Sequence, residues 1–384
     1  MKKLSAFLLT AATIVAAVVS CNKQGPAALN ANSAPDTGLL SIDIGVASDT
    51  KAAVNDMKDY QINRVQVFVF NADNILETSY YTDVAASTST NVEIATFTGN
   101  KTVYAILNHP RITALKPMVS TLANLESTLS DLRDNTPGSL VMSGKNTVNV
   151  AQYGSNGSTA SASPTPVTIY VKRLAAAVIL KSVTVDFTGT QYEGGSFQIK
   201  ETYLKNVFGR CPLGVSGMTS TANSAVLPSA VSDSQSQTEA YWYNFSKAVA
   251  GAPDCVSDAT AQDCTTAGAA TAMANNGRLH LAYPNRTVAD NNDDAFSPRH
   301  TRLVVKANIK ASAFVSPAVD QDVFYVLDLP VLQANNKYNV SFKVTMPGKA
   351  SDDNDSAADS EIGRLKPTII VDPWSGETSL EYTF

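Results

Sequence analysis

The residues best suited to acid–base or nucleophilic chemistry are three histidines, His109, His280 and His300. A serine hydrolase needs a nucleophile with a base in reach, and the sequence has no G-x-S-x-G segment to expose such a serine. His280 lies within the alternating segment 278–283, which is typical of a strand residue. The sequence therefore indicates a protein that is not an enzyme.

Two further patterns could bind a ligand through glycine or acidic residues. The segment Gly138–Asn146 (GSLVMSGKN) has the glycines and lysine of a phosphate loop, but five residues separate its glycines and Asn146 replaces Ser or Thr. The acidic segments 290–294 and 352–361 lack the mid-loop glycine and final glutamate of an EF-hand. Both acidic segments are interpreted as solvated loops, although spacing alone leaves a carboxylate pair for glycoside hydrolysis open. We expect no cofactor.

The four cysteines suggest disulfide chemistry and lipid attachment. Cys255 and Cys264 flank a polar loop, so a local bridge is the simplest pairing, and Cys211 is an alternative partner for either. Their spacing fits no zinc pattern, and we expect no metal site. The fourth, Cys21, ends an apolar segment.

The first twenty residues are typical of a secretory signal peptide, with a basic start at 1–3 and an apolar segment at 4–19. Ser20 and Cys21 follow it, so we expect cleavage between these two residues and a lipid on the Cys21 thiol. The alternatives are an ordinary signal peptide with a chance cysteine or a single membrane anchor. Residues 21–37 lack periodicity and are expected to tether the lipid to the fold.

The remaining chain predicts an all-β protein. A length of 384 residues favours two folded units, at about 150 residues per domain, which we place at 38–172 and 173–384. A formal charge of −5, with scattered Lys and Arg, makes nucleic acid an unsuitable partner. One helix is expected at 118–132. Short alternating segments predict antiparallel β-sandwiches: 64–70, 101–107, 168–171, 177–187, 302–309, 323–329 and 338–346.

Two strands at opposite ends of the chain have matching patterns. The first, at 39–46, places one set of apolar residues on a single face: Leu40, Ile42, Ile44 and Val46. The last, at 378–384, does the same with a second set: Leu380, Tyr382 and Phe384. Between the first two strands lies a polar loop that contains Lys51 and Ala52, the type of segment that proteases cut.

The order of several motifs along the chain resembles the fimbrillin family, the lipoprotein-derived major subunits of type V pili. The motifs are the Cys21 lipobox, VQVFVFNADNIL (65–76), KTVYAILNHP (101–110), LVMSG (140–144), VKRLAAAVIL (171–180), VFYVLDL, NNKYNVSFKVTMPG and the closing segment with Trp374. Each motif is weak alone, but their order is specific.

This resemblance implies two tandem transthyretin-like β-sandwich domains and polymerisation by strand exchange. It implies a maturation cut between Lys51 and Ala52, where better-known members have arginine in place of Lys51. The first strand would then be displaced, and the last strand of a neighbouring copy would act as the donor strand. The implied partners are copies of the same chain and accessory pilins, in a cell-surface fimbria that supports adhesion. The lipid on Cys21 would anchor the precursor to the outer membrane.

Three alternative interpretations of the sequence remain open. The first and last strands could each complete their own domain without exchange. The chain could be a surface glycan-binding lipoprotein, with Trp242 and the neighbouring Tyr241 and Tyr243 as an aromatic platform. It could also be an accessory tip or anchor pilin of the same system.

Overall fold

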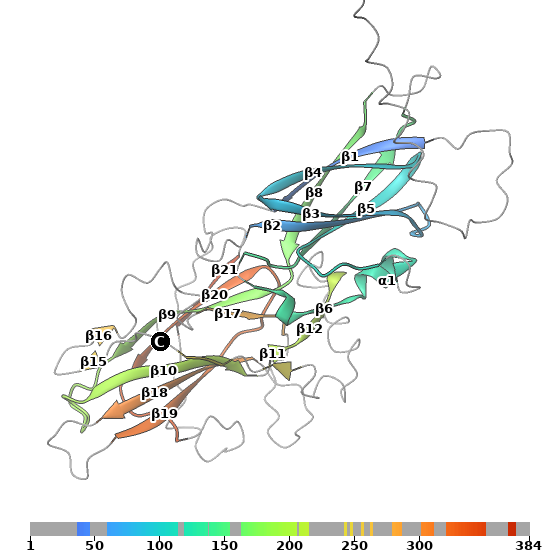
Figure 1. The fold of residues 1–384 in the computed structure, drawn as a ribbon. Helices are drawn as coiled ribbons and strands as arrows, with labels where there is room; N and C mark the ends of the chain where they lie inside the picture. Colours follow the sequence, from blue (N-terminus) through green and yellow to red (C-terminus); the bar gives the residue numbers. More distant parts are fainter. Residues whose placement is uncertain are drawn as a thin grey trace, which may run out of the picture. The chain divides into compact units, whose positions relative to one another are not determined.

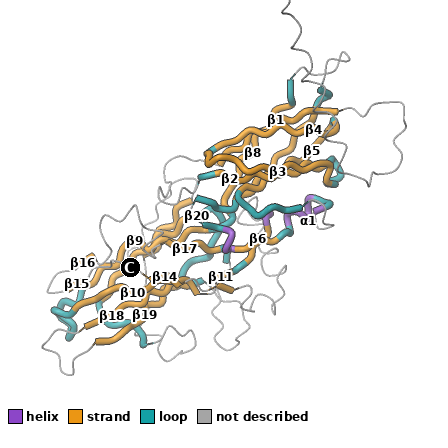
Figure 2. Tube along the Cα trace, in the orientation of Figure 1, coloured by secondary structure: helices purple, strands orange, loops and turns teal. Residues whose placement is uncertain are grey.

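The computed structural model describes the chain in several ranges. They are residues 37–46, 60–113, 119–136, 138–153, 163–205, 207–214, 279–285, 301–310 and 320–350, and the backbone of 242–243, 246–248, 255–256, 262–263 and 368–373. Residues 37–384 group into one compact unit. Strands dominate the described residues, which confirms the all-β class (Figures 1 and 2). No helix among the described residues combines the length and apolar character needed to span a membrane.

Seven strands form the first hydrogen-bonded path, in the order β3-β2-β5-β7-β8-β1-β4 (Figure 1). β7 pairs with β8 at only two register positions, Met142↔Arg173 and Ser143↔Lys172. The halves β3-β2-β5-β7 and β8-β1-β4 share one apolar core, named here the first core. The strands are β1 (Thr37–Val46), β2 (Ile62–Phe70), β3 (Leu76–Ser87), β4 (Ser89–Phe97), β5 (Gly99–Leu107), β7 (Met142–Val150) and β8 (Thr165–Arg173).

The strand sequences differ according to how many of their faces are buried. In β4 only alternate residues are buried, Val92, Ile94 and Thr96, because its other face is exposed. β2 is buried on both faces, which explains its nearly continuous apolar run. Val67 faces the first core, whereas Phe68 belongs to a second core.

This second core is shared by the remaining sheets. One sheet has the order β16-β9-β20-β21, with β17 also paired to β9, and the other has the order β14-β10-β18-β19, with β15 also paired to β10. Their strands are β9 (Ala176–Val185), β10 (Ser196–Lys205), β14 (Ser246–Ala248), β15 (Cys255–Val256), β16 (Gln262–Asp263), β17 (Leu279–Ala282), β18 (Arg302–Lys310), β19 (Asp320–Asp328), β20 (Asn336–Val344) and β21 (Thr368–Pro373).

The helix expected at 118–132 is wrong in its extent. The helix α1 covers only Leu122–Glu126, capped by the Thr121 side chain, which accepts a hydrogen bond from the Asn124 backbone. The hydroxyls of Ser127 and Thr128 donate to the Asn124 carbonyl and compete with helical pairing. The chain then forms β6 (Leu129–Asp131), paired with β12 (Arg210–Pro212), and a 3-10 turn at Leu132–Asp134. Pairing with β12 thus replaces the C-terminal end of the predicted helix.

Two strand pairs depart from the expected antiparallel arrangement. β1 pairs with β8 in parallel, and β9 pairs with β20 in parallel. Parallel neighbours cannot be joined by a hairpin, and in both cases long stretches of chain separate the two strands. Each of the two large parts of the chain thus contains one parallel strand pair. β8 ends at Arg173 and β9 begins at Ala176, but the proposed domain boundary at Arg173 stays a prediction.

Candidate functional site

The first strand, β1, lies inside the sheet with its apolar face in the first core. Leu40 and Ile42 are 0% exposed and Ile44 is 1% exposed. Val46 is partly buried and packs against the same core. The alternation predicted for this strand is therefore confirmed, and its apolar face is one wall of a closed core.

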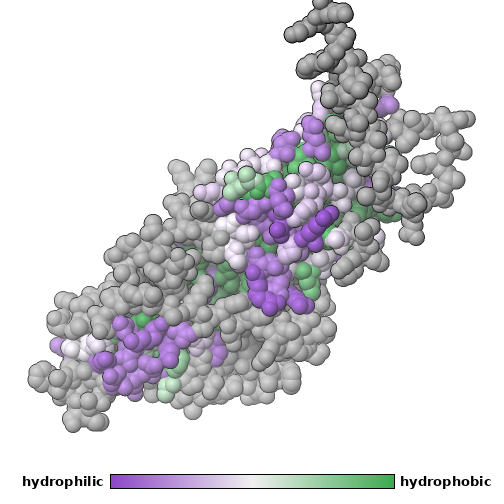
Figure 3. All heavy atoms as spheres, in the orientation of Figure 1, coloured by the Kyte–Doolittle hydropathy of each residue, from purple (hydrophilic) through white to green (hydrophobic). Residues whose placement is uncertain are grey.

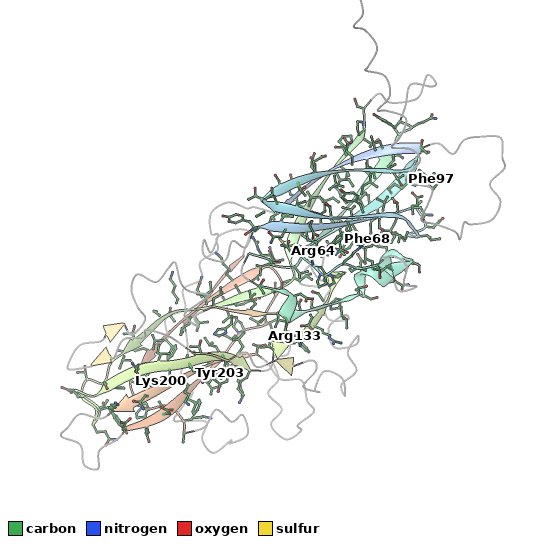
Figure 4. All side chains as sticks on the ribbon, viewed as in Figure 1. Arg64, Phe68, Phe97, Arg133, Lys200 and Tyr203 are labelled. Carbon is green, nitrogen blue, oxygen red and sulfur yellow. The ribbon has the colours of Figure 1, made fainter. Side chains whose placement is uncertain are left out.

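β1 has a strand partner on each side. It pairs antiparallel with β4 from Thr37↔Phe97 to Gly45↔Ser89, and in parallel with β8 from Leu40↔Thr165 to Val46↔Val171. Figure 1 shows β1 beside β4 and β8, and Figure 4 marks Phe97 at the end of β4. Both edges of the β1 backbone thus face a partner, and its removal would leave polar backbone groups without partners on β4 and β8.

The outward face of β1 makes few contacts. The Asn91 side-chain amide donates to Ser41 Oγ at 3.1 Å and to Asp43 Oδ1 at 2.7 Å, both in exposed positions. On the inward face, Gly38 is packed so closely that a Cβ there would clash with the Val150 side chain and lie 2.8 Å from a backbone oxygen. Gly45 faces open space. Besides its two backbone ladders, β1 is therefore attached mainly by burial of its apolar face, not by the contacts of its outward face.

β1 is also peripheral in the covalent chain. It is joined to β2 through residues 47–61, and neither β4 nor β8 is its neighbour in sequence. A cut in that connection would leave β1 bound to the remaining fold by non-covalent contacts alone. β1 thus has a strand partner on each side, and neither partner is joined to it directly in the chain.

Most of the residues predicted for processing, disulfide formation and strand donation lie outside the described residues. They are Ser20, Cys21, Lys51, Ala52, Cys264, Leu380, Tyr382 and Phe384. Cys255 begins the short strand β15, where only the backbone is described. Cys211 is a fully buried free thiol, and burial raises its pKa. The predicted Cys255–Cys264 bridge stays a prediction.

The residues considered for catalysis or phosphate binding make contacts that stabilise the fold. The His280 ring shares a hydrogen bond of 2.9 Å with the Thr202 hydroxyl, and burial lowers the pKa of His109. A Cβ on Gly144 would clash with the Tyr170 backbone, so this glycine allows close approach of β7 and β8, while Lys145 pairs with Glu126. The described residues contain no group of three His, Cys, Asp or Glu arranged to hold a metal ion.

Of the three aromatic residues considered as a glycan platform, Trp242 and Tyr243 form the short strand β13 (Trp242–Tyr243), which pairs with β11 (Val207–Phe208), and Tyr241 lies outside the described residues. Only the backbone of β13 is described. Two of the exposed large apolar side chains, Phe97 of β4 and Tyr170 of β8, belong to separate strands. On the face drawn in Figure 3, hydrophilic side chains cover much of the described surface.

A polar cluster in the first core was missed by the sequence analysis. Lys101 Nζ lies 2.7 Å from Glu77 Oε1, and the Thr96 hydroxyl donates to Glu77 Oε2 at 2.8 Å. Lys101 is only 5% exposed. The signal was present: Lys101 occupies an inward position in the alternation of 101–107, and a lysine there requires a buried partner.

Comparisons with known proteins place this geometry in context. Residues 40–173 match the family model described as major fimbrial subunit protein (FimA). A fimbrilin (FimA) from Porphyromonas gingivalis superposes with a TM-score of 0.58 at 14% identity, covering 90% of this chain and 99% of that chain. A proposed cell adhesion protein from Parabacteroides distasonis gives 0.57 at 17% identity, covering 90% and 100%. At these identities the likeness shows the fold. A comparison with curated proteins gave no match.

Proposed function

We propose that this chain, whose residues 40–173 match the model of the major fimbrial subunit family, is a structural subunit of a cell-surface fimbria. The predicted resemblance is confirmed for that part of the chain, and the fold of a fimbrilin extends over most of the remainder. The subunit is a pilin and supports adhesion. It assembles with copies of itself and with accessory pilins.

A single observation supports the assembly mechanism: β1 is paired on both edges, and Leu40, Ile42 and Ile44 of its apolar face are buried in the first core. While it is covalently attached, β1 occupies its groove at high effective concentration and excludes any strand from another molecule. A cut between Lys51 and Ala52 removes that advantage. β1 then departs and leaves an apolar groove lined by the unpaired edges of β4 and β8.

The donor strand of a neighbouring copy fills the vacated groove by adding a strand to both edges, the mode of recognition that includes donor-strand complementation between pilins. Leu380, Tyr382 and Phe384 repeat the alternation of Leu40, Ile42 and Ile44. Their burial contributes about 1.5–3 kcal/mol each, on the order of 5–9 kcal/mol before the cost of ordering the segment. Backbone pairing sets the direction and register.

The lipid at Cys21 has a role in this scheme. Signal cleavage between Ser20 and Cys21 leaves a precursor that a lipid holds at the outer membrane. Because Cys21 and β1 lie on the same side of the cut, maturation separates the polymerising part from its anchor. Release from the membrane and opening of the groove then result from one proteolytic event.

The test is a deletion of residues 378–384, compared with the variant Glu381→Gln, which changes only the outward face of the same segment. Both precursors are cut with a lysine-directed protease, and the products are analysed by size-exclusion chromatography and electron microscopy. The deletion should yield folded monomers that bear an open groove, and Glu381→Gln should yield fibres. Fibres from the deletion variant would overturn the proposal.

A further inference from the structure

Among the strands of the first path, β4 is the one whose pairing depends most on β1. It stands at the end of the path β3-β2-β5-β7-β8-β1-β4, and its only strand partner among the described residues is β1. β8, on the opposite side of β1, keeps its two-residue pairing with β7. Loss of β1 would therefore deprive β4 of all its described ladder pairing.

An empty groove also offers β4 an alternative partner. β4 runs antiparallel to β1 and β8 runs parallel to it, so β4 and β8 are antiparallel to each other. A shift of about 4.8 Å, one strand spacing, would bring them within pairing distance. Val92 of β4 and Val167 of β8 line the same core, and their attraction would favour this collapse. A closed groove could not accept a donor strand.

Thr96 adds a polar tie from β4 to the opposite half of the sandwich that does not pass through β1, beside the packing of Val92 and Ile94 in the shared core and the one-residue links to β3 and β5. Thr96, near the end of β4, donates its hydroxyl hydrogen to Glu77 Oε2 of β3 at 2.8 Å. The other oxygen of Glu77 accepts from Lys101 Nζ of β5 at 2.7 Å. β3 and β5 both pair with β2, so this cluster connects β4 to strands that β1 does not touch in the ladder.

The cluster is shielded from water. Thr96 is 8% exposed, and the side chains of Lys101 and Glu77 are 4% and 14% exposed. Hydrogen bonds to a charged group in such surroundings are stronger than neutral ones, and removal of one partner leaves a buried polar group unsatisfied. The geometry therefore resists displacement of β4 by a full strand spacing.

We propose that Glu77, Thr96 and Lys101 form a latch that holds β4 in place when β1 has left, so that the groove stays open for the incoming strand. This inference rests on the proposed function, because the latch acts only on a vacated groove. In the precursor, β4 is held by its pairing with β1, and the latch is redundant for its position. The three residues thus serve assembly as positioning residues.

The test compares Thr96→Val with Thr90→Val. Both substitutions replace a threonine of β4 by a residue of similar shape, but Thr90 is not bonded to Glu77. A double variant, Glu77→Leu with Lys101→Met, replaces the buried pair by apolar groups of similar volume, which is often neutral for stability. Hydrogen exchange of residues 89–97 and association of a synthetic peptide of residues 378–384 are measured before and after cleavage and removal of β1.

Before cleavage, exchange in 89–97 should be alike in all variants. After removal of β1, Thr96→Val and the double variant should lose protection there and bind the peptide at least about tenfold more slowly than Thr90→Val, the factor expected for one hydrogen bond to a charged group. Equal behaviour of Thr96→Val and Thr90→Val would refute the latch alone. If the cut wild-type chain retained β1 and bound no peptide, this result would refute the proposed strand exchange, and the latch would then have no role.

Discussion

The substitution Ile42→Ala tests the central role assigned to β1. Ile42 is 0% exposed, lies in the middle of the strand and pairs in register with Val92 on one side and Val167 on the other. Truncating a fully buried isoleucine to alanine costs about 2–5 kcal/mol, because transfer free energy is lost and a cavity remains. In the intact precursor this loss should appear as a lower free energy of unfolding.

After cleavage the same loss acts on the non-covalent attachment of β1. A cost of about 2–5 kcal/mol corresponds to a dissociation constant raised about 30-fold to several thousand-fold. Since changes within one interface act mostly on dissociation, β1 should leave the cut variant faster. Assembly, if it waits for β1 to leave, should then start earlier.

The assay uses a specific protease site introduced into residues 47–59, and release of the N-terminal fragment is followed by size-exclusion chromatography with mass detection. Asp43→Asn is the matched control, because Asp43 is exposed on the same strand and asparagine keeps the acceptor for Asn91. The control should release β1 at the wild-type rate. Equal release rates for Ile42→Ala and wild type would refute the reasoning that burial of this face holds β1.

Three further outcomes are expected. Gly45→Ala should slow release of β1 by about two- to fivefold, because alanine is more stable than glycine in a strand interior by roughly 0.5–1 kcal/mol and the site has room for a Cβ. Gly38→Ala should speed release, because the added Cβ would clash with its neighbours. Hydrogen bonds from Lys343 and, secondly, from Thr188 lower the pKa of Asp186 from 3.8 to about 2, so their contribution to stability is present above pH 3.8 and is lost as the pH falls towards 2. Unfolding midpoints of Lys343→Met and wild type should differ above that window and converge below it. Cys211 should resist alkylation at pH 8 until the chain unfolds, as measured by peptide mass mapping, because burial raises its pKa and blocks access.

The strands were predictable because their signal is local. Alternation placed Leu40, Ile42 and Ile44 on one buried face, and the β-branched run at 64–70 predicted the strand β2. The helix expected at 118–132 was wrong because its apolar spacing did not reveal that residues 129–131 pair with the distant strand β12. Local propensity is overridden when a distant segment offers better pairing.

The strand class, the buried face of β1 and the pattern shared by 39–46 and 378–384 could all be predicted from the amino-acid sequence, because each depends on side-chain alternation within one short segment. The sequence did not reveal that β1 lies between β4 and β8, that it runs parallel to β8, or that Glu77 binds both Lys101 and Thr96. These facts depend on which distant segments become neighbours when two sheet halves close around one core. That choice is made by the packing of the whole unit, and alternation within one strand carries no information about it.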